Sequence, residues 1–111
     1  MKKINILKNN YDFERIIKNN KSFKGEFCYY YVEKENNENP YKFGISVSKK
    51  IGNAVVRNTY KRRIKSILDK NKYYNSFNCI IILKKNVLDS DYRNIEISIN
   101  KDLKNLNLIK E

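Results

Sequence analysis

The sequence predicts an α+β fold: a two-layer sandwich with the element order α-β-β-α-β-α and a small mixed sheet. Three observations support this prediction. The chain has 111 residues, 41% of them hydrophobic, enough for a single domain over 1–111 with a radius of gyration of about 13 Å. Segments with helical spacing of apolar residues alternate along the chain with short strand-like segments. Of the few glycine and proline residues, Gly25, Pro40 and Gly52 lie where these segments end.

The first element is a predicted helix over residues 10–19. Its apolar side chains recur at helical spacing, at Phe13, Ile16 and Ile17. Asn9 or Asn10 is placed to cap the first turn, because a short side-chain oxygen there can accept from a free backbone N–H.

Two strands follow. The segment 27–34 is rich in aromatic residues, which favour strands, and a short additional strand near 22–24 is compatible with the pattern. The polar loop 35–40 connects this strand to the segment 42–48, where apolar residues alternate with glycine and serine. Such alternation predicts a strand with one buried face.

A second helix is predicted over residues 53–70, with Asn53 as its N-cap. With Val56 at 0° and about 100° per residue, one arc of roughly 0–120° is apolar. It contains Tyr60, Ile64, Ile67 and Leu68. An arc of roughly 100–240° is polar and basic, with Arg57, Asn58, Lys61, Arg62 and Lys65.

The last elements are a strand and a helix. The segment 79–83 is continuously apolar, as expected of a strand buried on both faces. Asp89 or Ser90 can cap a final helix, whose apolar face carries Tyr92, Ile95, Ile99, Leu103 and Leu106. The two cysteines, Cys28 and Cys79, lie in apolar surroundings without a CxxC spacing, which favours buried free thiols in a reducing compartment.

Charge limits the classes of function. The chain has 24 Lys and Arg against 12 acidic residues, a formal net charge of +12, which indicates a polyanionic partner. It has no histidine, which excludes imidazole catalysis and most zinc sites. No apolar run has the length of a membrane span or a secretory leader. We therefore expect a cytoplasmic nucleic-acid-binding protein with no membrane contact.

The basic residues gather in one segment. Residues 49–65 contain seven of them and no acidic residue: Lys49, Lys50, Arg57, Lys61, Arg62, Arg63 and Lys65. A merely solvated helix face normally mixes both signs. The absence of mixing favours a surface for phosphates, where each cation also releases counterions from the nucleic acid. We call these seven side chains the basic stripe.

The segment 42–65, KFGISVSKKIGNAVVRNTYKRRIK, resembles the motif region of the bacterial ribonuclease P protein subunit. In that family a strand leads through a turn into a helix that begins with an Arg-Asn-Arg motif. The residues that match are Ser48, Lys49, Lys50, Gly52, Asn53, Ala54, Arg57, Asn58, Lys61 and Arg62. Beyond the motif, the resemblance extends over essentially the whole chain, including LKNNYDFERI near the start and the final helix.

The resemblance implies a non-catalytic protein bound to a catalytic RNA. The holoenzyme removes the 5′ leader of precursor tRNA, with Mg²⁺ held through the RNA, no metal or cofactor held by the protein, and no protein partner. It implies contact with the catalytic RNA by Lys49, Lys50, Asn53, Arg57, Asn58, Lys61, Arg62 and Lys65. It also implies a cleft for the single-stranded leader beside the first helix and the sheet, with Phe13 and Tyr30 facing the leader.

Three residues depart from the family pattern. Thr59 stands where the third motif residue is usually basic, and Tyr60 stands where an aliphatic residue is usual. Ile17 replaces an aromatic residue that relatives can carry beside the leader cleft. Arg63 is one turn after Thr59 on the helix, so it can replace part of the missing cation. The alternative, that its long side chain only extends from the edge of the apolar arc to water, stays open.

Other interpretations remain open at this stage. The tyrosines of 27–34 can fill the core of a half-buried sheet as well as stack on bases. A ribosomal or other structural RNA-binding protein would share the basic composition, and a DNA-binding regulator would need a helix-turn-helix pair that the pattern lacks. Asp89 and Asp91 form a close acidic pair, and a helix cap explains them better than metal-dependent hydrolysis.

Overall fold

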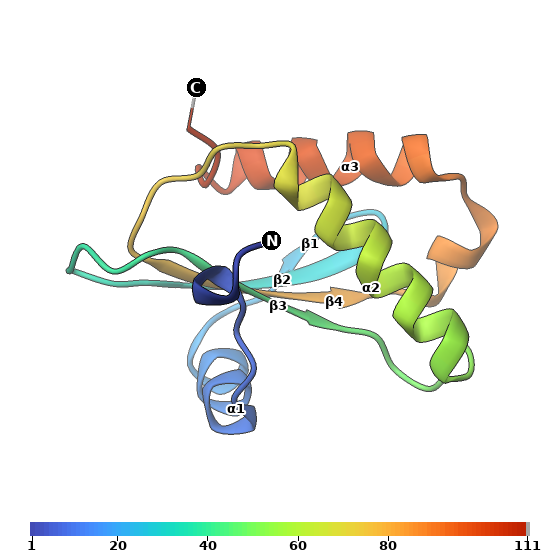
Figure 1. The fold of residues 1–111 in the computed structure, drawn as a ribbon, viewed down its shortest axis with the longest axis horizontal. Coiled ribbons are helices and arrows are strands. Elements are labelled where there is room, and N and C mark those ends of the chain that lie inside the picture. Colours follow the sequence, from blue (N-terminus) through green and yellow to red (C-terminus); the bar gives the residue numbers. More distant parts are fainter. Residues whose placement is uncertain (111) are drawn as a thin grey trace.

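The computed structural model describes residues 1–110 (Figure 1). Its principal elements are α1 (Asn10–Asn19), β1 (Phe23–Lys24), β2 (Cys28–Lys34), β3 (Lys42–Ser46), α2 (Ala54–Asp69), β4 (Phe77–Leu83) and α3 (Tyr92–Asn105). Two short 3-10 helices, η1 (Lys3–Asn5) and η2 (Lys85–Asp89), were not predicted. The predicted element order is confirmed, the short strand β1 included. The radius of gyration of 13.2 Å agrees with a single domain of this length.

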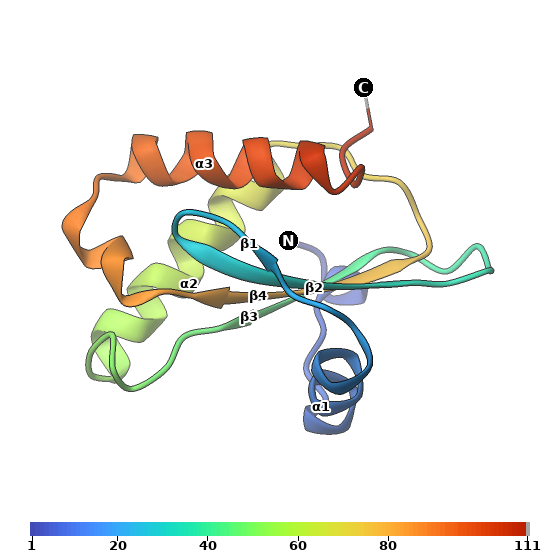
Figure 2. The ribbon, with the colours of Figure 1, turned by 180° about the vertical axis from the view of Figure 1, so that it is seen from behind.

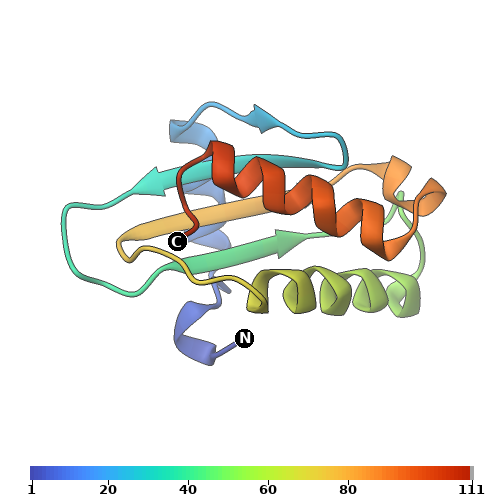
Figure 3. The ribbon, with the colours of Figure 1, turned by 90° about the horizontal axis from the view of Figure 1, so that it is seen from above.

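The four strands form one mixed sheet in the order β1-β2-β4-β3 (Figure 3). β2 pairs antiparallel with both β1 and β4, whereas β3 pairs parallel with β4. A parallel pair needs a long crossover between its strands, and α2 is that crossover. The central strand β4 is buried on both faces, as its continuous apolar sequence predicts.

The main core lies between the sheet and the helices α2 and α3, which cover one face together (Figure 2). The opposite face carries α1, which was not anticipated by the two-layer description and adds part of a third layer (Figure 1). The apolar arc predicted for α2 is confirmed, since Tyr60, Ile64, Ile67 and Leu68 are all buried. An aromatic group closes the core at the end of the sheet where β3 and β4 begin: Tyr41, Phe43, Tyr73 and Phe77.

The helix caps are set by short polar side chains. Asn9 caps α1 and Asn53 caps α2, both as predicted. The cap predicted for α3 was wrong: Asp91 caps this helix, and its Oδ1 accepts from the backbone N–H of Asn94 at 2.8 Å. The shift has a local cause, because η2 takes up residues to Asp89 and leaves Ser90 extended before α3 begins.

The two cysteines are free thiols buried in the main core, as predicted. Burial raises the pKa of Cys28 to about 12. Neither thiol therefore has the exposure or the acidity of a reactive cysteine.

Candidate RNA-binding surface

The basic stripe follows the outer side of α2 and the turn that precedes it. Lys49 and Lys50 are exposed in this turn, Arg62 and Arg63 are exposed on the helix, and the other three cations are half-buried. Among residues 1–110 the ion pairs number four, and none involves a cation of the stripe. These charges are therefore available to a ligand.

Packing against α3 decides which side of α2 the stripe occupies. Tyr92 of α3 donates to the hydroxyl of Ser66 at 3.1 Å, and Lys70 pairs with Glu96 at 2.6 Å. These contacts hold one side of α2 against α3, so the predicted basic arc lies on the side turned away from α3. In Figure 3 this helix runs along the β3 edge of the sheet, opposite β1.

A shallow hollow of about 430 Å³ lies on this outer side of α2, lined by Val55, Asn58, Lys61, Arg62 and Lys65. Arg57 is half-buried beside the core, and its Nε is shielded from solvent without a hydrogen-bond partner among the described residues. A shielded N–H donor without a partner carries a free-energy cost, which a bound acceptor would remove. The start of α2 adds its own positive potential at Asn53.

Asn53 and Thr59 are partly engaged within the protein. The side-chain oxygen of Asn53 accepts from the backbone N–H of Val56 at 3.0 Å, which leaves its amide group exposed. The hydroxyl of Thr59 donates to the carbonyl oxygen of Val55 at 2.9 Å. The guanidinium of Arg63 lies 5.1 Å from the centre of the Tyr60 ring, exposed to solvent next to the Thr59 position.

The structure corrects one predicted site residue, Tyr30. Its side chain is 0% exposed and lies in the main core on the side of α2 and α3. Its hydroxyl donates to a carboxylate oxygen of Asp102 at 2.7 Å, and burial raises the pKa of the phenol. Phe13 lies on the opposite face of the sheet, where it and Tyr31 pack against the same small apolar group. Tyr30 and Phe13 therefore cannot face one ligand.

Tyr31, not Tyr30, lies on the face of the sheet that carries Phe13. Successive side chains of a strand point to opposite faces, and those of Tyr29 and Tyr31 point to the face that carries α1. Both are half-buried, and Nζ of Lys84 lies 4.7 Å from the centre of the Tyr29 ring. Figure 1 shows that α1 covers only part of this face, leaving the end next to the turn before α2 without a helix. The alternation of side chains along β2 can be predicted from the sequence. The sequence does not show which of the two sets of side chains lies under α3.

Gly44 explains how Phe13 comes so close to the sheet. A Cβ on Gly44 would lie 2.4 Å from Cζ of Phe13, so only glycine leaves room for the ring. The ring of Phe13 thus rests on the backbone of β3 and remains half-exposed at its rim. Aromatic rings beside cations, as Tyr29 is beside Lys84 on this face, are one arrangement that can hold single-stranded nucleic acid.

No helix in the described part of the chain is long and apolar enough to cross a membrane. Residues 1–110 also contain no group of three or more carboxylate or thiol side chains that could hold a metal ion.

The fold and this surface define a class: a small α+β protein in which, among residues 1–110, the cations of one helix have no ion pair, as is typical of nucleic-acid-binding proteins. The family model described as Ribonuclease P matches residues 1–107. The chain belongs to the ribonuclease P protein family. It is thus a subunit of the ribonucleoprotein endonuclease that acts in tRNA processing, and its partner is RNA.

Individual relatives are similar over the whole length. The ribonuclease P protein component of Mycoplasma mycoides is 40% identical over 109 residues, covering 96% of this chain and 99% of that protein. The one from Streptococcus agalactiae is 39% identical over 111 residues, covering 98% and 100%. The solved RNase P protein of Staphylococcus aureus superposes with a TM-score of 0.82 at 32% identity, covering 97% of this chain and 100% of that one.

Proposed function

We propose that the chain binds the catalytic RNA of ribonuclease P through the basic stripe and the 5′ leader of precursor tRNA through the face that carries α1. The observation that supports this division most directly is the lack of any ion pair for the stripe among residues 1–110, although the chain has acidic residues elsewhere. The contacts with the catalytic RNA come from Lys49, Lys50, Asn53, Arg57, Asn58, Lys61, Arg62, Arg63 and Lys65. Leader contacts come from Phe13 and Tyr31.

In this proposal the protein acts in the cytoplasm and provides a positively charged surface of defined shape for the RNA. The catalytic RNA holds the Mg²⁺ ions and carries out the hydrolysis of the phosphodiester. Cations at the RNA surface replace counterions that would otherwise be needed to hold the complex together. The test is reconstitution of leader removal with the cognate catalytic RNA at low magnesium. We expect the protein to raise the cleavage rate, and failure to do so at any magnesium concentration would contradict the proposal.

The first prediction concerns the leader. Phe13→Ala and Tyr31→Ala are each expected to weaken binding of precursor tRNA to the holoenzyme by about 1–3 kcal/mol, the value of one stacked base. Affinity for mature tRNA, which lacks the leader, is expected to stay the same. The measurement is the dissociation constant of both RNAs.

Tyr74→Ala is the matched control for these variants. Tyr74 is also an aromatic residue, but it is 51% exposed and lies in the connection between α2 and β4, not on α1 or β2. It should leave both affinities unchanged. Equal losses for precursor and mature tRNA in the Phe13 and Tyr31 variants would rule out a leader site on this face.

The second prediction concerns Arg63. If this guanidinium replaces part of the cation missing at Thr59, Arg63→Ala should lower the affinity for catalytic RNA by about 1–2 kcal/mol, the range of a charge-assisted hydrogen bond. The same substitution in a Thr59→Arg background should cost clearly less. If the Arg63→Ala protein binds the RNA as tightly as the parent, Arg63 does not contribute to RNA binding. Its role would then be limited to the contact with the Tyr60 ring.

A further inference from the structure

The apolar attachment of α1 to the sheet is small. Its fully buried members are Leu7, Ile16 and Ile80, a group separate from the main core under α2 and α3. Phe13 and Ile17 pack against it only in part. So small an apolar group gives a short helix little resistance to rolling about its own axis, because hydrophobic contact is not directional.

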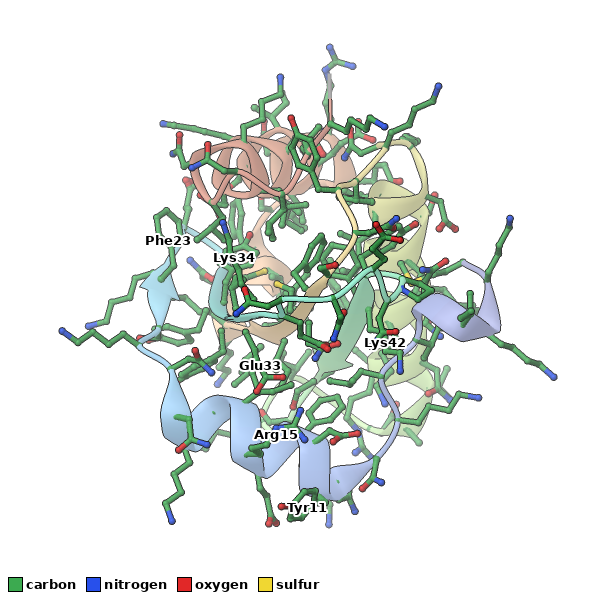
Figure 4. All side chains as sticks on the ribbon, turned by 90° about the vertical axis from the view of Figure 1, so that its left-hand side faces the viewer. Tyr11, Arg15, Phe23, Glu33, Lys34 and Lys42 are labelled. Atoms are coloured by element: carbon green, nitrogen blue, oxygen red, sulfur yellow. The ribbon has the colours of Figure 1, made fainter. Side chains whose placement is uncertain are left out.

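Arg15 adds a directional contact on the flank of α1. Its Nε and Nη2 donate to the two carboxylate oxygens of Glu33 on β2, at 3.1 and 2.9 Å. Its Nη1 donates to Asp12 on the same helix at 2.6 Å. Figure 4 shows Arg15 extending from α1 toward Glu33. A planar guanidinium that binds both oxygens of a carboxylate fixes orientation as well as distance.

The Glu33 carboxylate is itself held in place. The side-chain amide of Asn78 on β4 donates to Glu33 at 2.9 Å and to Glu35 at 2.8 Å. Glu33 and Asn78 are direct partners in the β2–β4 register, and Asn78 is buried. The Arg15 guanidinium holds the pKa of Glu33 below its usual value, so the carboxylate is ionised at neutral pH. The contact thus ties α1 to two strands.

Phe13 and Arg15 project from different sides of α1, about 200° apart on a helical wheel. Phe13 rests on the backbone at Gly44 on β3, while Arg15 is bonded to β2. Contacts on two sides of one helix together determine its roll. The roll in turn determines how the Phe13 ring lies on the sheet.

We propose that Arg15 is a positioning residue for leader recognition, which holds α1 through Glu33 so that Phe13 faces the leader. This inference rests on the proposed function of the α1 face. It gives Arg15 a role that differs from that of the stripe cations: Arg15 acts on the RNA through the orientation of α1.

Direct contact with a phosphate is the competing role for an arginine beside an RNA-binding face. The bonds of Arg15 argue against it, because Nε, Nη1 and Nη2 each already donate to a carboxylate oxygen. Together with Asp12 and Glu33, its formal charge adds to −1. Such a group repels phosphate overall.

Glu33→Gln separates positioning from direct phosphate contact. It removes a negative charge and disrupts the two hydrogen bonds between Arg15 and Glu33. Simple electrostatics predicts equal or tighter RNA binding for this variant. Positioning predicts weaker binding of the precursor. With holoenzyme reconstituted from the cognate catalytic RNA, we expect Glu33→Gln and Arg15→Lys each to raise KM for precursor tRNA about fivefold to tenfold, a part of what one lost base stack costs. The single-turnover rate at saturation and the affinity for mature tRNA should stay unchanged.

Glu35→Gln is the matched control. It removes the same charge two residues further along the chain, and Glu35 contacts Asn78 and Asn37 but not Arg15. It should leave KM unchanged. A Glu33→Gln holoenzyme with the KM of the parent or lower would overturn the inference, as would equal losses for precursor and mature tRNA. A parent holoenzyme without any preference for precursor over mature tRNA would instead overturn the proposed function itself.

Discussion

Tyr30→Ala is expected to lower the free energy of unfolding by about 3–5 kcal/mol, the usual cost of removing a large aromatic side chain from a core. The Tyr30 ring is fully buried and packs edge-to-face against Phe23, with 6.0 Å between the ring centres. Its hydroxyl is also a hydrogen-bond donor to the buried carboxylate of Asp102. The total free energy of unfolding of a small domain is only about 5–15 kcal/mol. The measurement is equilibrium unfolding in urea.

Tyr30→Phe provides the comparison. It keeps the ring and removes only the hydroxyl, leaving Asp102 without this donor, so a smaller loss of about 1–3 kcal/mol is expected. Under conditions where each variant is folded, both should bind precursor and mature tRNA with the ratio of the parent. A Tyr30→Ala protein as stable as the parent but impaired in precursor binding would show that Tyr30 faces the leader after all.

Binding of the catalytic RNA is expected to weaken steeply with salt. If the stripe neutralises five to seven phosphates, the slope of log K against log[salt] should be roughly −4 to −6, by analogy with duplex DNA. Raising the salt threefold should then lower the affinity about 10²- to 10³-fold. Replacing Lys61, Arg62 and Lys65 together by alanine should make the slope shallower by about 2 to 3. The measurement is a salt titration of the complex.

A second triple variant controls for net charge alone. Arg93, Lys101 and Lys104 are exposed on α3, away from the stripe, and their replacement by alanine removes the same charge. This variant should retain the slope of the parent. A parent slope shallower than about −2, or equal changes in the two triple variants, would show that the stripe is not the contact surface.

Local sequence determined the elements and the basic stripe of this protein. The helical spacing of α2, its Asn53 cap and the continuously apolar β4 all depend on residues close in the chain, so their periodicity was sufficient to predict them. The same holds for part of the stripe, because the helical period places Lys61, Arg62 and Lys65 away from the apolar arc, whereas Arg63 lies at the edge of that arc. The motif of 48–62 also identified the family from the sequence, which the family match over 1–107 confirms.

Tertiary packing decided which face of the sheet each side chain meets. Alternation along β2 separates Tyr30 from Tyr29 and Tyr31, but it does not say which set lies under α3. That choice depends on Asp102, 72 positions away in the sequence, whose carboxylate accepts a hydrogen bond from the Tyr30 hydroxyl. Arg15 is similar: in the sequence it is one more cation, and only the approach of Glu33 from another element converts it into a contact that orients a helix. Such pairings form between segments that are remote in the chain, and no local period encodes them.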